Sequence, residues 1–227
     1  STIVRWIINL APFGIMGLVF TNVVSNGLAI FTQYGKLLLL LVGTMLFMAF
    51  VINPIIIFIY LRCNPYPLVF RCLRESGLTA FFTRSSAANI PVNMAMCEKL
   101  GLDKDFYSVS IPLGATINMD GTAIYQCVAT IFLATCCGMT LTLGQMVTIV
   151  VTATLASIGT AGTPGAGMIM LAMVLEAMNI PVDMIMIIYG IDRLFDMGRT
   201  CLNITGDISC ACCVTKWENK KAAQTAK

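Results

Sequence analysis

The chain reads Ile191-Asp192-Arg193-Leu194-Phe195-Asp196-Met197-Gly198-Arg199-Thr200-Cys201-Leu202-Asn203-Ile204-Thr205-Gly206-Asp207 toward its C-terminal end. An α-helix turns about 100° per residue, so most of its polar members share a stripe roughly 100° wide. They are Asp192, Asp196, Arg199, Thr200, Asn203 and Asp207. An ionised side chain near the centre of a bilayer costs about 3 kcal/mol or more, so it persists there only where it is paired, hydrated or used. The stretch predicts an otherwise apolar helix with one functional polar face.

The composition places this helix in a membrane protein. Of the 227 residues, 58% are hydrophobic and 11% are charged, and the mean hydropathy is +0.86. Ordinary soluble domains carry roughly 25% charged residues. The formal net charge is only +3, which does not suggest nucleic-acid binding. We therefore expect an integral membrane protein that contacts lipid.

The basic residues gather in two parts of the chain. Short basic loops between apolar spans tend to stay in the cytoplasm. We therefore expect both clusters, and the C-terminus with them, on the cytoplasmic side. The clusters are Arg62, Arg71 and Arg74, and Lys216, Lys220, Lys221 and Lys227.

Two uninterrupted apolar spans come first. They cover about Ile3–Leu28 and Leu37–Leu61, and each is long enough to cross roughly 30 Å of hydrocarbon as a helix. The chain starts at Ser1, directly in the first of these runs and without a signal-peptide pattern. We expect a part of a longer protein.

The next segment, Ser76–Leu100, is too polar in its middle to cross a membrane as one helix. The polar run Thr83–Pro91 divides it into two arms, Ser76–Phe82 and Val92–Leu100. Unpaired backbone at membrane depth has to be buried in protein or face water. The segment therefore predicts a re-entrant hairpin whose arms each reach about halfway across.

The same order then recurs. A long apolar span, Tyr107–Gly138, is interrupted at Asn118–Thr122, and another hairpin and a last span follow it. Paired interrupted segments in oppositely oriented halves indicate a transport site at the midplane. We expect an all-α integral membrane fold, with two full transmembrane helices followed by an inverted pair of re-entrant hairpin plus broken transmembrane helix. The later segments are the arms Thr148–Ile158 and Met168–Met178, the tip Gly159–Gly167 and the last span Met184–Cys213.

Two carboxylates in different spans suggest a cation site. Asp196 lies in the last span, and Asp120 lies in the earlier one between Asn118 and Thr122. Carboxylates, together with carbonyl groups freed by Gly-containing breaks, suit a small hard cation such as Na+. The carbonyls around Ser157–Thr160 would also attract a cation, whereas half-helix N-termini attract a carboxylate.

Arg199 suggests the substrate. Its planar guanidinium pairs bidentately with a carboxylate, which favours an amino acid with a second, side-chain acid. The structural alternative is that Asp196 and Arg199 pair with each other at i,i+3 and attach the helix to a neighbour.

Cysteine chemistry offers no competing site. Of the ten cysteines, Cys210, Cys212 and Cys213 cluster, but the sequence contains no histidine. A zinc site is not expected, since buried cysteine packs as a small apolar residue.

Four motifs occur in a fixed order along the chain, and through them the sequence resembles the dicarboxylate/amino-acid:cation symporters, the bacterial and archaeal relatives of glutamate transporters. The resemblance covers essentially the whole chain. It implies an elevator-type symporter of the inner (plasma) membrane, a homotrimer when full length, with Na+ ions as co-substrates and no organic cofactor. The motifs are Arg84-Ser85-Ser86 with Pro91, Asn118-Met119-Asp120-Gly121-Thr122, Gly159-Thr160-Ala161-Gly162-Thr163-Pro164-Gly165-Ala166-Gly167, and Asp196-Met197-Gly198-Arg199-Thr200 through Asn203 and Asp207.

The resemblance also implies a division of the chain. Residues 1–33 would hold a helix of the static trimerising scaffold, and residues 34–227 would form the moving transport domain. The transport domain would consist of helix 34–62, re-entrant hairpin 66–100, broken helix 104–138, re-entrant hairpin 143–180, last helix 183–217 and a basic tail. The second hairpin would act as the extracellular gate.

The resemblance assigns roles to individual residues. Asp196 would take the amino group of the substrate, and Arg199 the side-chain carboxylate. The implied substrate set is Arg84, Ser85, Ser86, Thr122, Thr163, Gly167, Asp196, Arg199, Thr200 and Asn203. One Na+ site would use the carbonyls of Gly114, Asn118 and Asn203 with the carboxylate of Asp207. A second would use the carbonyls of Thr116, Ser157, Ile158 and Thr160 near the sulfur of Met119. A third would use Asp120 and the Asn118 side chain, together with a helix upstream of Ser1.

The two halves of the sequence indicate different substrates. The stretches Ser85–Pro91 and Arg62–Pro67 resemble the serine/threonine branch of the family, whereas the second half resembles the acidic branch. Because Arg199 would face the substrate side chain, our primary expectation is Na+-coupled symport of glutamate, aspartate or C4-dicarboxylates. The alternative is Na+-coupled serine/threonine symport.

Two other classes are weighed against a transporter. An intramembrane aspartyl protease could use Asp120 and Asp196 as an acid–base pair, but neither flank resembles the expected protease motifs. An ion channel would not need the Arg199 clamp. We therefore do not expect an enzyme.

Overall fold

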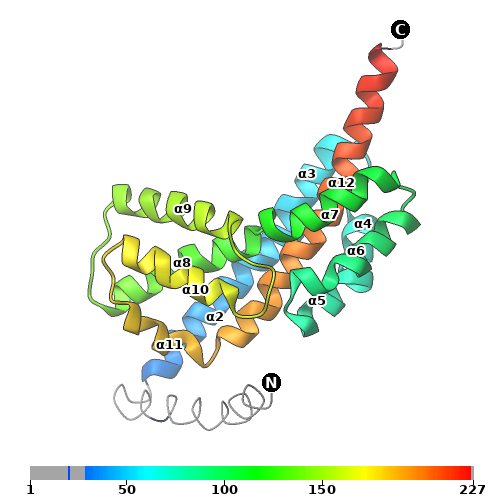
Figure 1. Cartoon of the computed structure of the whole chain (residues 1–227). Coiled ribbons are helices and arrows are strands. Elements are labelled where there is room, and N and C mark those ends of the chain that lie inside the picture. Colours follow the sequence, from blue (N-terminus) through cyan, green and yellow to red (C-terminus); the bar gives the residue numbers. More distant parts are fainter. Residues whose placement is uncertain (1–19, 21–28, 226–227) are drawn as a thin grey trace.

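The computed structural model describes Phe20 and residues 29–225, and every regular element among them is helical. The expected first span, Ile3–Leu28, lies outside the described residues apart from Phe20. Figure 1 shows the helices gathered around one long central helix that projects beyond the others at its C-terminal end. The all-α prediction is confirmed for the described part of the chain.

The first described helix runs through α2 (Ala29–Phe47), η1 (Met48–Ile52) and α3 (Asn53–Leu61). Its portion Tyr34–Leu61 is the one described helix that is long and apolar enough to cross a membrane. The π-helical turn η1 ends two residues before Pro54, whose ring nitrogen cannot donate to the preceding turn. The helix ends where Arg62 adopts a left-handed conformation, and Lys216 donates to the Leu61 carbonyl.

The first hairpin has a shorter tip than the sequence predicted. Its first arm is α4 (Tyr66–Cys72), η2 (Leu73–Gly77) and α5 (Leu78–Thr83), and its second is α6 (Ser86–Lys99). Only Arg84 and Ser85 are non-helical, and Ser85 Oγ caps α6 by accepting from the Ala88 N–H at 3.1 Å. The expected start of the second arm at Val92 is therefore wrong, because α6 includes Pro91 and begins at this cap.

The broken span and the second hairpin follow. The break between α7 (Lys104–Ile117) and α8 (Asp120–Cys136) covers only Asn118 and Met119, so it is shorter than the expected Asn118–Thr122. The arms α9 (Leu143–Ile158) and α10 (Ala166–Ala177) pack against each other and against α8. A capping box formed by Thr142 and Gln145 starts α9.

The last segment was expected to form one helix over residues 183–217. It forms two α-helices separated by a turn. After η3 (Val182–Met184) and α11 (Ile185–Tyr189), a turn at Gly190 and Ile191 precedes α12 (Asp192–Thr225). The helix α12 also continues through most of the expected basic tail. At 1.5 Å per residue its 34 residues span about 51 Å. It packs against α3, α5, α6, α7 and α8, whereas α9 and α10 pack on α8 and on each other.

Candidate functional site: a pocket between two hairpin tips

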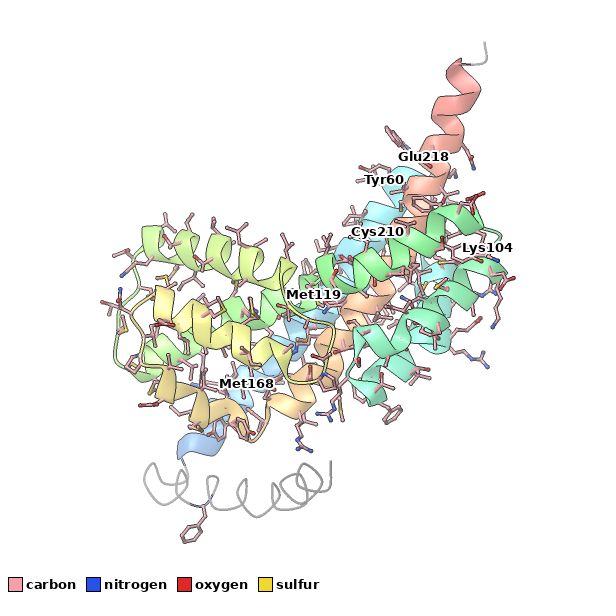
Figure 2. All side chains as sticks on the ribbon, in the orientation of Figure 1. Tyr60, Lys104, Met119, Met168, Cys210 and Glu218 are labelled. Atoms are coloured by element: carbon pink, nitrogen blue, oxygen red, sulfur yellow. The ribbon has the colours of Figure 1, made fainter. Side chains whose placement is uncertain are left out.

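The two hairpin tips meet the break between α7 and α8 and the middle of α12. Figure 2 places Met119 of this break near the centre of the view. A small closed pocket lies here, and its volume of about 10 Å³ is the space of about one water molecule. All members of the predicted substrate set except Ser85 line it, namely Arg84, Ser86, Thr122, Thr163, Gly167, Asp196, Arg199, Thr200 and Asn203.

Ser85 instead joins the two tips. Its Oγ donates to the Gly162 carbonyl at 2.8 Å, and the Ala87 N–H donates to the same oxygen at 3.0 Å. A Cβ on Gly162 would lie 3.0 Å from Ala87 N and 3.0 Å from Ala115 O, so the close approach requires glycine. The Gly165 N–H donates to Asp196 Oδ2 at 3.2 Å. The second tip is thus hydrogen-bonded to the first tip and to α12, which closes the pocket.

Arg199 is held by two carboxylates of its own helix. Its Nε donates to Asp196 Oδ1 at 3.1 Å, and its Nη2 lies 2.9 Å from the same oxygen. Its Nη1 lies 3.4 Å from Asp192 Oδ1, and the Tyr125 ring centroid lies 4.4 Å from its Cζ. The i,i+3 pairing that the sequence left as an alternative is therefore present. The guanidinium is therefore not free to pair bidentately with a substrate carboxylate, as the expectation of an acidic substrate required.

The charges around the pocket are balanced. Arg84 Nη1 lies 4.0 Å from Asp196 Oδ2, so this carboxylate lies between two guanidinium groups. Asp192, Asp196 and Arg199 are each less than 10% exposed. Two basic and two acidic side chains therefore balance in charge here. The Arg84 side chain is 27% exposed, so the balance chiefly reduces the cost of burying Asp192, Asp196 and Arg199.

Asn203 connects the pocket to the break in the preceding span. Its Oδ1 accepts from the Gly121 N–H at 2.8 Å, and its Nδ2 lies 3.0 Å from Thr122 Oγ1 and 3.1 Å from Met119 Sδ. Gly121 permits this packing, because a Cβ there would lie 2.7 Å from the Arg199 carbonyl. The start of α8 is therefore fastened directly to α12.

The residues of the first predicted Na+ site lie close together beside Asn203, which also lines the pocket. Asn118 Nδ2 lies 3.0 Å from the Asn203 carbonyl and 3.0 Å from Asp207 Oδ1. A Cβ on Gly114 would lie 2.5 Å from Asp207 Oδ1, so this glycine forms a cradle for the carboxylate. Asp207 Oδ2 is buried and accepts no hydrogen bond from the described residues. The Gly114 carbonyl accepts from the Asn118 N–H at 2.8 Å, so the orphaned carboxylate oxygen is the part of this group that fits a small hard cation.

The second and third groups are only partly assembled. Met119 and Thr160 line the pocket, but the Ser157 carbonyl accepts from the Thr160 N–H. Thr116 and Ile158 are both exposed. Asp120 accepts only from the Gly121 N–H among the described side-chain hydrogen bonds. Asp120 and Asn118 also line a separate groove of about 600 Å³, which lies beside Tyr60 and Cys210 (Figure 2).

The sequence placed Asp192 on the polar stripe and Gly162 in the second tip, but it assigned no individual role in the site to either of them or to Tyr125. Asp192 lies seven residues, or two turns, before Arg199 on the same face, so its contact with Arg199 could have been predicted. The contacts of Tyr125 and Gly162 could not, because their partners lie in distant segments.

The sequence profile of the sodium:dicarboxylate symporter family matches residues 1–217. The chain belongs to this family. Its members are transporters, so it is not an enzyme. A serine/threonine transporter of Bifidobacterium adolescentis is 54% identical over 215 residues, which cover 93% of this chain and 50% of that protein. One of Streptococcus agalactiae is 50% identical over 212 residues, covering 92% and 53%.

A third relative is the serine/threonine transporter of Streptococcus thermophilus, which is 48% identical over 212 residues, covering 92% of the chain and 53% of that protein. The chain thus spans about half the length of the curated relatives that it matches. The names of these symporters favour the serine/threonine alternative over our primary expectation of an acidic substrate.

Proposed function

We propose that this chain is the substrate-carrying part of a Na+-coupled serine/threonine symporter. The observation that carries the proposal is the neutralisation of Arg199 by Asp192 and Asp196. A zwitterionic serine or threonine has no net charge, so it would leave the two basic and two acidic side chains around the pocket in balance. Glutamate or aspartate would add one negative charge to this buried region, and that charge would need a further partner.

The polar lining supports a substrate hydroxyl group. Ser86, Thr122, Thr163 and Thr200 present hydroxyl groups, and Asn203 presents an amide. Such groups both donate and accept hydrogen bonds. The carboxylate of Asp196 would take the substrate ammonium group, and the N–H groups at the two tips would take its carboxylate.

Cation coupling follows from the remaining acids. Asp120 and Asp207 have no basic partner among the described residues within ion-pair distance. Moving two uncompensated carboxylates through a membrane is costly. Na+ bound at Asp207 with Gly114, Asn118 and Asn203, and at Asp120, would neutralise them. The second group around Met119 and Thr160 would complete the set when the second tip rearranges.

Movement of the second hairpin would admit the substrate, since the closed pocket has room for about one water molecule. Opening breaks the hydrogen bonds of the Gly162 carbonyl and of the Gly165 N–H. In the whole protein, hairpins 66–100 and 143–180 would be re-entrant parts of an elevator-type transport domain over 34–227. Residues 1–33 would belong to the scaffold of a homotrimer, and the C-terminus would lie in the cytoplasm. An upstream helix would cover the groove beside Asp120.

The test is uptake by the full-length protein reconstituted in liposomes. Labelled serine should accumulate only under an inward Na+ gradient, and excess threonine should compete with it more strongly than excess aspartate. Collapse of the pH gradient alone should leave uptake intact. Na+-driven aspartate uptake that serine does not inhibit would contradict the substrate assignment, and uptake driven by protons alone would contradict the coupling ion.

A further inference from the structure

An apolar groove runs along the back of α12. It consists of two hollows of about 450 and 320 Å³, which share Leu73, Phe81 and Cys201. Leu194, Gly198 and Cys201 form its α12 wall. At 100° per residue these three positions lie roughly opposite Asp196, Thr200 and Asn203. The groove and the polar pocket therefore lie on opposite sides of the same helical segment.

The length of the groove corresponds to one leaflet of a membrane. Leu38 and Phe50 both line the larger hollow and are twelve residues apart on one helix, which is a rise of about 18 Å. Half of the hydrocarbon thickness of a bilayer is about 15 Å. The volume of each hollow also lies within the roughly 300–1,000 Å³ of a small-molecule site.

One charged residue lines the groove. Arg74 lines the smaller hollow about one helical turn from Phe70, whose ring centroid lies 5.9 Å from that of Phe50 in the larger hollow, and every other described lining side chain is uncharged. Arg74 is exposed and has no acid within ion-pair distance in the described part of the chain. The neighbouring acid, Glu75, already lies 2.9 Å from Arg71 and 3.0 Å from Lys99. The groove thus carries one uncompensated positive charge near Phe50 and Phe70.

We propose that this groove binds an acyl chain of an anionic phospholipid, whose phosphate group pairs with Arg74. An apolar channel of one-leaflet length with a cation near one end complements a lipid of this charge in both shape and electrostatics. Basic residues at a membrane surface attract anionic headgroups, and a planar guanidinium pairs bidentately with phosphate. A transmembrane helix is about 10–12 Å wide and would leave Arg74 without an anion unless it supplied an acid.

The bound chain would lie close to the transport site. A Cβ on Gly77 would lie 3.0 Å from Cys201 Sγ, and one on Gly198 would lie 3.1 Å from Met45 Sδ. Small residues therefore bring α12 against its neighbours at the floor of the groove. An acyl chain seated there packs behind the segment that carries Thr200. The inference does not depend on which amino acid is transported.

The experiment uses the full-length protein in nanodiscs of phosphatidylethanolamine with a small fraction of phosphatidylglycerol that carries a photoactivatable diazirine on one acyl chain. Mass spectrometry of the digested protein locates the label. We expect labelled peptides from residues 70–81 and 194–202. Arg74→Gln should reduce this labelling about fivefold, the effect of one basic residue near an anionic surface, and Arg74→Lys should retain most of it.

Arg62→Gln is the matched control, because Arg62 belongs to the same basic cluster but does not line the groove. It should leave the labelling unchanged. A phosphatidylethanolamine probe, whose ammonium group offsets its phosphate charge, should lose less labelling in Arg74→Gln than the phosphatidylglycerol probe. Equal labelling of other exposed apolar faces, such as α9, would overturn the proposal. So would an unchanged yield in Arg74→Gln, or cross-links from Phe81→Cys to an upstream segment that show protein filling the groove. Serine uptake by each variant reports separately on the proposed function.

Discussion

Replacing Gly114 by alanine would place a methyl group against the carboxylate that we assign to a cation. The added Cβ would lie 2.5 Å from Asp207 Oδ1, whereas ordinary contacts begin at 3.4 Å. The oxygen would have to move by the difference, 3.4 minus 2.5 or about 0.9 Å, far beyond the tolerance of about 0.2 Å for metal–ligand distances. Disturbing the support of a metal ligand typically lowers affinity about 10–100-fold. We expect the half-saturating Na+ concentration for serine uptake to rise about tenfold or more.

The assay is the initial rate of labelled serine uptake into proteoliposomes as a function of external Na+. The KM for serine at saturating Na+ should change much less, because Asp207 does not line the substrate pocket. Gly35→Ala is the matched control, since a Cβ at this helical position meets no atom within 4 Å. Alanine is favoured over glycine in a helix by about 1 kcal/mol, so loss of helix stability does not explain a defect. An unchanged Na+ dependence in a folded Gly114→Ala protein would refute the assignment of Asp207.

Three further predictions follow from single contacts. Ser85→Ala removes both the hydrogen bond to the Gly162 carbonyl and the cap of α6, which together contribute about 2 kcal/mol of stabilisation. The serine KM should therefore rise at least tenfold, whereas the control Ser108→Ala should leave it unchanged. Asp192→Asn leaves Arg199 with one carboxylate, so aspartate should inhibit serine uptake at a lower concentration than in wild type; an unaltered inhibition curve would argue against the charge-balance reasoning. Asn93→Ala deprives Ser76 and the Ile204 carbonyl of a hydrogen-bond partner, so it should lower the free energy of unfolding in detergent by about 1–3 kcal/mol. A thermal transition at the wild-type temperature would contradict this prediction.

Much of the candidate site could be predicted because its residues lie in short motifs. The stripe on α12 follows from helical periodicity alone, and the structure brings most of its members to the pocket or to Asp207. The ends of the breaks were less predictable. Pro91 and Gly121 suggested long interruptions, whereas the Ser85 cap and the packing of Gly121 on α12 keep both residues helical.

Hydropathy and helical periodicity are properties of neighbouring residues, so they were enough to predict an all-helical membrane protein with two pairs of interrupted segments. The contacts that build the pocket could not be predicted in this way, because they join distant parts of the chain. Ser85 and Gly162 are 77 residues apart, and Tyr125 reaches Arg199 from another helix. The carboxylates that neutralise Arg199 lie on its own helix. The joined hairpin tips and the Tyr125 ring come from distant segments, and these meet only when the chain folds around α12.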